Sequence, residues 1–300
     1  MRDLHRRLEE QGQERLIFAA PTRNARRLVE IAAAVLGDDA DERVFTHPVL
    51  CLTILPHRAR PEHEIWKRVN GPYTLMVQPT ADHAGRYHGV PHGSKARLIL
   101  LYLQTEAVKT NSRVIELGTS MRSWLRSMGV TITGPNYAEV RRQARKIERA
   151  LVSFTFEGDE STVSWQDTII RGSFERPSSA YDARTVELSE SFFRSIVDRP
   201  VPLCEAAIRV LGERCMALDL YLWLAYRLHS LRRPIVVPWP ALHNQFGGAT
   251  RLLKHFKPVF AREIQAALAA YRDARVELVP GGAQLSPSPP PTGSLLRAVR

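Results

Sequence analysis

The sequence predicts an α+β fold in which two mainly helical units, each closed by a small β-hairpin, follow one another along the chain. Three observations support this prediction. Apolar residues recur at three- and four-residue spacing in several stretches after residue 92. Short strand-like runs around glycine turns follow the last helix of each unit. The order of elements is the same in both units, and a hydrophobic content of 44% allows a buried core.

The first unit is expected over residues 91–175. Ser94 is a candidate N-cap for its first helix, and Gly129 stands where its second helix should stop. The expected elements are a helix over 95–109, a strand over 113–117, helices over 119–128 and 137–150, and a hairpin of strands 151–157 and 162–171.

The second unit is expected over residues 187–286. Pro258 suits the first position of its third helix, where a missing N–H costs little. The expected elements are a helix over 216–231, a strand over 235–237, helices over 240–246 and 258–271, and a hairpin of strands 275–279 and 283–285. In both units this is the order of a winged helix, in which the third helix reads DNA and the hairpin is the wing.

Three segments lie outside these two units. Residues 1–90 form an N-terminal region whose fold the pattern does not specify, apart from an amphipathic helix over 22–36, for which Thr22 is a candidate N-cap. Residues 176–186 are mostly polar and are expected to be a linker. Residues 287–300 form a proline-rich tail.

The positive charge of the chain is concentrated in two segments. Lys and Arg number 42 against 31 for Asp and Glu, which gives a net charge of +11. Residues 95–150 contain 11 basic and 4 acidic residues, and residues 232–275 contain 8 basic and 2 acidic residues. Two local basic surfaces favour a polyanionic partner, with nucleic acid first and an anionic membrane surface second.

The expected third helix of the first unit separates its apolar residues from its cations. At 100° per residue, Tyr137, Val140 and Ile147 share one face and five cations share the other. The five cations are Arg141, Arg142, Arg145, Lys146 and Arg149. Only two acidic residues accompany them, so the helix is predicted to contact DNA, the alternative being a solvated basic face. The second unit offers a looser set, which consists of Arg251, Lys254, Lys257 and Arg262.

Several classes of protein are disfavoured. Cys51, Cys204 and Cys215 are too few and too scattered for a disulfide framework or a zinc site. Apolar runs are too short to span a membrane, and the charged N-terminus does not resemble a secretory signal. The sequence therefore predicts a soluble cytoplasmic protein with no membrane partner.

The sequence also gives no reason to expect a cofactor, a metal or a catalytic residue. The segment from Gly89 to Lys95 is one residue short of a phosphate-binding loop. His83, His88 and His92 are not arranged as in a DNA-nicking enzyme, because an HxH pair and a suitably placed tyrosine are missing. The protein is expected not to be an enzyme.

The blocks GVPHGSKARLILLYLQTEAVKTNSRVIELGTSMRSWLRSMGV and TGPNYAEVRRQARKIERA resemble the plasmid-encoded RepA family of replication initiators. The later blocks LDLYLWLAYRLHSL, WPALHNQFGG and FKPVFAREIQAALAAY do so too, and the resemblance covers roughly residues 89–290. It implies a plasmid replication initiator that binds repeated origin sequences (iterons) in double-stranded DNA. It also implies recruitment of host initiator and helicase proteins, control of copy number, and dimerisation in some members.

Three other functions remain as alternatives. A transcriptional repressor would use the same DNA-binding physics. A DNA-nicking replication enzyme would leave nicks or a covalent adduct on supercoiled origin DNA. A lipid-surface protein is disfavoured, because the face opposite the cations is needed for the core.

Overall fold

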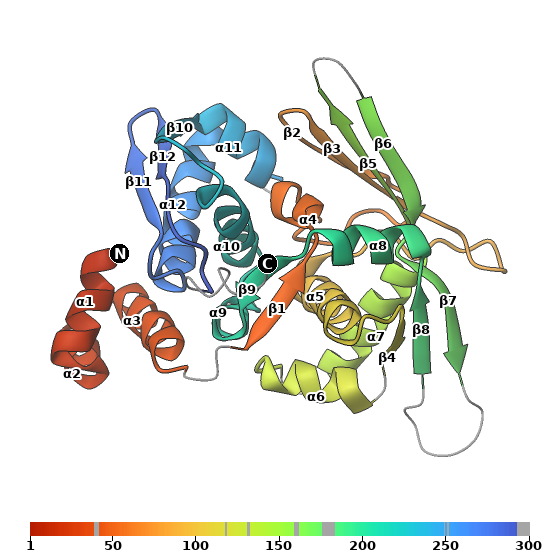
Figure 1. Cartoon of the computed structure of the whole chain (residues 1–300), viewed down its shortest axis with the longest axis horizontal. Helices are drawn as coiled ribbons and strands as arrows, with labels where there is room; N and C mark the ends of the chain where they lie inside the picture. The colour runs from red at the N-terminus through yellow and green to blue at the C-terminus, as the bar shows by residue number, and fades with distance from the viewer. Residues whose placement is uncertain are drawn as a thin grey trace. The chain divides into compact units, whose positions relative to one another are not determined.

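The computed structural model describes residues 1–38, 42–117, 119–130, 133–158, 162–175, 184–248, 250 and 252–292. Helices and antiparallel strands are mixed, which confirms the α+β class (Figure 1). The chain divides into two compact units: unit 1 contains residues 1–44 and 202–300, and unit 2 contains residues 45–201. The chain passes from unit 1 to unit 2 within β1 (Arg43–Thr46) and returns within β9 (Val201–Cys204).

This division differs from the expected boundaries near residues 90 and 186. Residues 1–44 belong with the C-terminal part of the chain, and residues 45–90 belong with the first basic segment. The reason in unit 2 is strand pairing, because β2 (Trp66–Asn70) and β3 (Tyr73–Pro79) extend a sheet whose other strands lie after residue 149. Part of the expected linker is also regular structure, since β8 spans Arg184–Leu188.

Unit 2 contains the three helices predicted for the first basic segment. They are α5 (Gly93–Thr110), α6 (Thr119–Ser127) and α7 (Gly134–Glu148), and β4 (Val114–Glu116) lies between the first two. Ser94 is inside α5, whose N-cap is His92. The helix α7 begins at Gly134, three residues before the expected start at residue 137.

The hairpin that follows α7 differs from the expected wing. Strands β5 (Ala150–Glu157) and β6 (Thr162–Thr168) pair with β2 and β3 in a four-stranded antiparallel sheet of order β2-β3-β5-β6. The chain continues into β7 (Ile170–Glu175), which pairs with β8, and β8 pairs with β4. The resulting order β4-β8-β7 places the last strand between the other two.

A buried arginine ties the N-terminal part of unit 2 to α5. Arg97 is 5% exposed, and its guanidinium donates to the carbonyl oxygens of Leu55, Pro56 and Gly93 at 2.8–3.2 Å. Three carbonyl acceptors satisfy a charged group that burial would otherwise destabilise. This arrangement holds the segment after α4 (Pro48–Leu52) against the first turn of α5.

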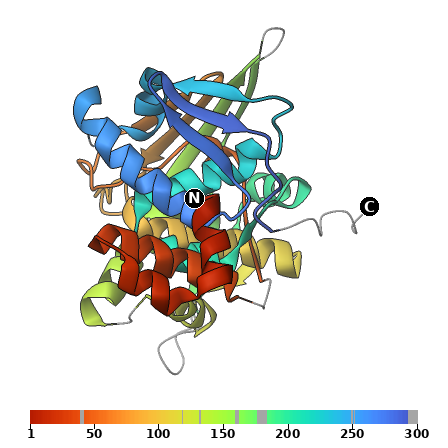
Figure 2. The ribbon, with the colours of Figure 1, turned by 90° about the vertical axis from the view of Figure 1, so that its left-hand side faces the viewer.

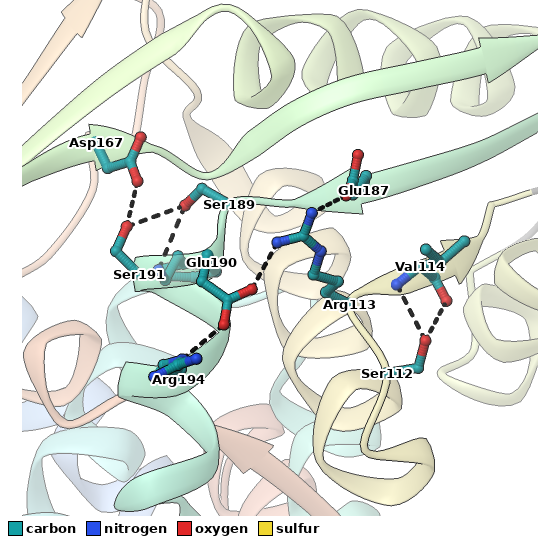
Figure 3. Close-up of polar contacts among 10 residues, drawn as sticks. Ser112, Arg113, Val114, Asp167, Glu187, Ser189, Glu190, Ser191 and Arg194 are labelled. Carbon is teal, nitrogen blue, oxygen red and sulfur yellow. Dashed lines mark hydrogen bonds and ion pairs between the residues drawn. The ribbon is translucent and has the colours of Figure 1, made fainter.

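A network of polar contacts joins the three-stranded sheet to α8 (Glu190–Asp198) (Figure 3). Arg113 forms ion pairs with Glu187 on β8 and with Glu190 at the start of α8. Glu190 also accepts from Arg194 at 2.6 Å. Ser191 donates to Asp167 at the end of β6, so α8 is fixed by both sheets.

Unit 1 has the same order of helix, strand, helix and helix as unit 2, but two strands follow it where unit 2 has four. Its helices are α10 (Cys215–Leu228), α11 (Trp239–Phe246) and α12 (Leu253–Ala269). Along the chain, β10 (Ile235–Pro238) lies between α10 and α11, and β11 (Arg275–Val279) and β12 (Gly282–Ser286) follow α12. The sheet order is β10-β12-β11, which again places the last strand in the middle. The helix α12 begins five residues before the expected start, so Pro258 lies inside it.

The remaining helices of unit 1 come from its N-terminal segment and from the start of its C-terminal segment. The N-terminal helices are α1 (Arg2–Gln11), α2 (Gln13–Ala19) and α3 (Arg23–Leu36), and α9 (Glu205–Leu211) follows β9. Thr22 caps α3 as predicted, with its Oγ1 accepting from the Ala25 N–H at 3.1 Å. Figure 2 shows α3 beside α12, and the two helices are in contact.

The ring of His47 makes the stability of unit 2 sensitive to acid. Burial lowers the pKa of His47 to about 4 from 6.5, so the unfolded chain takes up a proton in this range before the folded protein does. The contribution of His47 to the free energy of unfolding is therefore full above pH 6.5 and is lost as the pH drops toward 4. We expect His47→Asn, which keeps an acceptor for the Val49 N–H, to reduce the loss of unfolding free energy between pH 7 and pH 5 by about 2 kcal/mol. Urea unfolding at both pH values checks this, and an unchanged loss would contradict it.

Candidate nucleic-acid interface

The helix α7 has one buried face and one exposed face, as its sequence predicts. Val140, Ala144 and Ile147 are buried, and the helix packs against α5 and β7. Pro135 stands in its first turn, where the backbone N–H has no partner to lose. The apolar stripe therefore fixes which side chains of α7 face outward.

Four of the five predicted cations lie on the outward face. Arg141, Arg142 and Arg145 are exposed, and Arg149, directly after the last helical residue, is half-buried. On a helical projection these side chains span about 100° of arc, and the exposed Ala138 lies near its middle. The structure thus presents a convex basic surface without a bulky side chain at its centre.

Lys146 departs from the expectation of an outward-facing cation. It is 7% exposed, and a Cβ built on Gly89, whose φ is +74°, would lie 3.1 Å from its Nζ. Burial and the neighbouring Arg142 lower the pKa of Lys146, while Glu62 opposes them. The reason is that Lys146 lies at the edge of the basic arc, where the segment before α5 packs against the helix.

Two residues at the start of α7 hold the exposed arginines in place. Glu139 forms an ion pair with Arg142. The guanidinium of Arg141 lies 6.0 Å from the centre of the Tyr137 ring, and that of Arg122 on α6 lies 5.2 Å from the same ring. Exposed pairs of this kind contribute little to stability, so a phosphate can replace Glu139 as the partner of Arg142 at small cost.

Arg122 on α6 lies near this surface, and Arg126 is on the same helix; the sequence analysis singled out neither. They lie four residues apart on α6, and Arg126 is exposed. The signal that could have identified them is their spacing of four residues within a helix that contains no acidic residue. They extend the basic character of α7 to the preceding helix.

The cations predicted in unit 1 are less uniform. Lys254 is exposed, and Lys257, half-buried, has its Nζ 5.2 Å from the centre of the Trp239 ring. Arg262 is exposed, but its Nε donates to Glu263, which also pairs with the half-buried Arg214 at 2.9 Å. Arg251 lies outside the described residues. Lys254 and Lys257 therefore share the N-terminal turns of α12, and Arg262 lies about two turns further along.

Gln143 anchors the buried side of α7. It is fully buried, its Oε1 accepts from the His92 N–H at 2.9 Å, and its Nε2 donates to Glu139 at 2.7 Å. We expect Gln143→Leu to cost about 1–3 kcal/mol of unfolding free energy, because the His92 N–H loses its acceptor. Thermal or urea unfolding measures this cost. The same change at the exposed Gln78 is the control, and equal effects at the two sites would contradict the assigned role.

A metal-binding cluster and a membrane-spanning helix are both absent from the part of the chain that the structure describes. No group of three or more His, Cys, Asp or Glu side chains is placed to hold a metal ion there. Among the same residues, no helix is long and apolar enough to cross a bilayer.

Comparison with known proteins gives one family and one fold. The family model described as "Plasmid encoded RepA protein" matches residues 90–239. The crystal structure of selenomethionine derivatives of domains 2 and 3 of RctB superposes with a TM-score of 0.52 at 13% identity, covering 79% of this chain and 96% of that one. A second crystal structure of RctB domains 2–3 gives a TM-score of 0.49 at 12% identity, covering 76% and 83%. No curated protein sequence matches the chain.

Proposed function

The chain belongs to the plasmid-encoded RepA family of replication initiators, and on that premise we propose that it binds repeated origin sequences in double-stranded plasmid DNA. The observation that supports this most is the exposed face of α7. It presents three exposed arginines, with a half-buried arginine at its end. Arginines suit both phosphates and guanine edges, which they contact bidentately.

We propose further that each unit contains a winged helix. Both contain the order helix, strand, helix and helix, followed by a pair of strands that joins the first strand in a sheet; in unit 2, β5 and β6 come before this pair. Both three-stranded sheets place the last strand in the middle. The third helices are α7 and α12, and the wings are β7–β8 and β11–β12. Within unit 2 this replaces the expected wing, because β5 and β6 belong to the other sheet.

Two recognition helices in one chain predict the length of DNA that the protein covers. Recognition helices in successive major grooves on one face of the duplex are separated by one helical turn, roughly 34 Å. Hydroxyl-radical footprinting on the origin of the plasmid that encodes the chain should therefore show protection over about two turns per repeat. Protection confined to one short half-site would contradict the use of both units.

A replication test distinguishes the proposed role in initiation from a role in repression. A plasmid that carries the origin should replicate only when the gene is supplied, and replication without the gene would instead favour a repressor. Recruitment of host initiator and helicase proteins, control of copy number, dimerisation and a cytoplasmic location belong to the same proposal. We also propose that the protein is not an enzyme, so supercoiled origin DNA incubated with it and Mg²⁺ should stay free of nicks and covalent adducts.

A further inference from the structure

Unit 2 contains an apolar cavity that the DNA-binding surface does not use. Its volume is about 270 Å³. One wall is the inner face of the four-stranded sheet, with Val77 on β3, Phe154 on β5 and Trp165 on β6. Residues of α4, α5 and α8 line it from the other elements of the unit, and nearly all of them are aliphatic or aromatic.

Two N–H donors stand among these apolar side chains. The Nε1 of Trp165 is buried and has no hydrogen-bond partner among the described residues. His47, at the N-cap of α4, accepts the Val49 N–H on Nδ1 at 3.1 Å, so its neutral ring carries the proton on Nε2. Within the described part of the chain, no residue accepts from that Nε2. The Trp165 donor is buried without an acceptor, which is costly, and a ligand that brings an acceptor removes this cost.

We propose that this cavity is a binding site for a small neutral aromatic molecule of about two fused rings that carries one hydrogen-bond acceptor. The size follows from the volume, because an apolar protein cavity of about 150 Å³ holds benzene. The neutral charge follows from the lining, which offers no cationic side chain to pair with an anion. The acceptor follows from the buried, unpaired Trp165 donor.

Quinoline and naphthalene are the probes that test the proposal on the full chain, because they share a shape and differ in one acceptor nitrogen. The chain has five tryptophans, so indole ¹⁵N labelling gives five Nε1–H resonances, and Trp165→Phe identifies that of Trp165. We expect quinoline to shift this resonance downfield in a saturable titration. Naphthalene should bind about tenfold more weakly, because it leaves the donor unpaired.

The substitution Trp165→Phe should remove the preference for quinoline over naphthalene. Trp223→Phe, the same change at a buried position of unit 1, should leave it intact. Absence of saturable quinoline binding to the unaltered chain would overturn the proposal. Equal affinity of the unaltered chain for the two probes would also overturn it, and neither result depends on a variant that folds.

Discussion

The double substitution Arg142→Glu and Arg145→Glu is expected to weaken binding to origin DNA by at least about 100-fold. Each arginine supplies a charge-assisted contact of about 1.5–3 kcal/mol, and each glutamate adds repulsion from the phosphates. Both side chains are exposed, so the fold should lose less than about 1 kcal/mol, which arises mainly from repulsion with Glu139. Fluorescence anisotropy with a labelled origin repeat measures the affinity, and circular dichroism measures the fold.

The matched control is Arg26→Glu with Arg27→Glu. These arginines are also exposed neighbours on a helix, α3 of unit 1, and their reversal changes the net charge by the same amount. The control separates loss of a specific contact from loss of overall positive charge. If both double variants lost affinity equally, α7 would have no special role. If the α7 variant unfolded, the assignment of its outward face would be wrong.

The salt dependence of binding is the second large effect. The described candidates for phosphate contact, with the buried Lys146 left out, are Arg141, Arg142, Arg145, Arg149, Lys254, Lys257 and Arg262. Contact by all of them gives a slope of log affinity against log salt of about −6, so affinity should fall about 10³–10⁴-fold between 50 and 200 mM KCl.

Single alanine variants refine this prediction. Loss of Arg145 should reduce the magnitude of the slope by about 1 and weaken binding to all sequences alike, provided that it contacts a phosphate. An arginine that reads a base should instead lose discrimination at one position of the repeat. A slope near −2 for the unaltered chain would show that most of these side chains do not contact the backbone.

The helices were predictable from local signals, and their faces followed from the apolar period. Thr22 as a cap and the buried stripe of Val140, Ala144 and Ile147 are determined by neighbouring residues alone, and the structure shows both. The strands were less predictable. The strand β5 fits equally well as a wing or as a sheet strand until its partner is known, and that partner, β3, lies about 75 residues earlier in the chain.

The burial of Lys146 was unpredictable for the same reason. Its position on the helix is at the edge of the exposed arc, and the residues that cover it, near Glu62 and Gly89, belong to a segment whose fold had no local signal. The early start of α12 reflects tertiary packing over local preference, since Phe256 before Pro258 is fully buried. Long-range contacts therefore decided the unit boundaries, the wing and one of the five cations.

Site-specific photocrosslinking from α7 tests the central claim most directly. A benzophenone amino acid in place of Ala138 sits in the middle of the exposed basic arc, and the same group in place of Glu30 on α3 is the control. Irradiation with origin duplex should crosslink DNA from position 138, with a yield that falls as salt rises, and not from position 30. A footprint on the repeats without crosslinking from position 138 would contradict the placement of α7 on DNA.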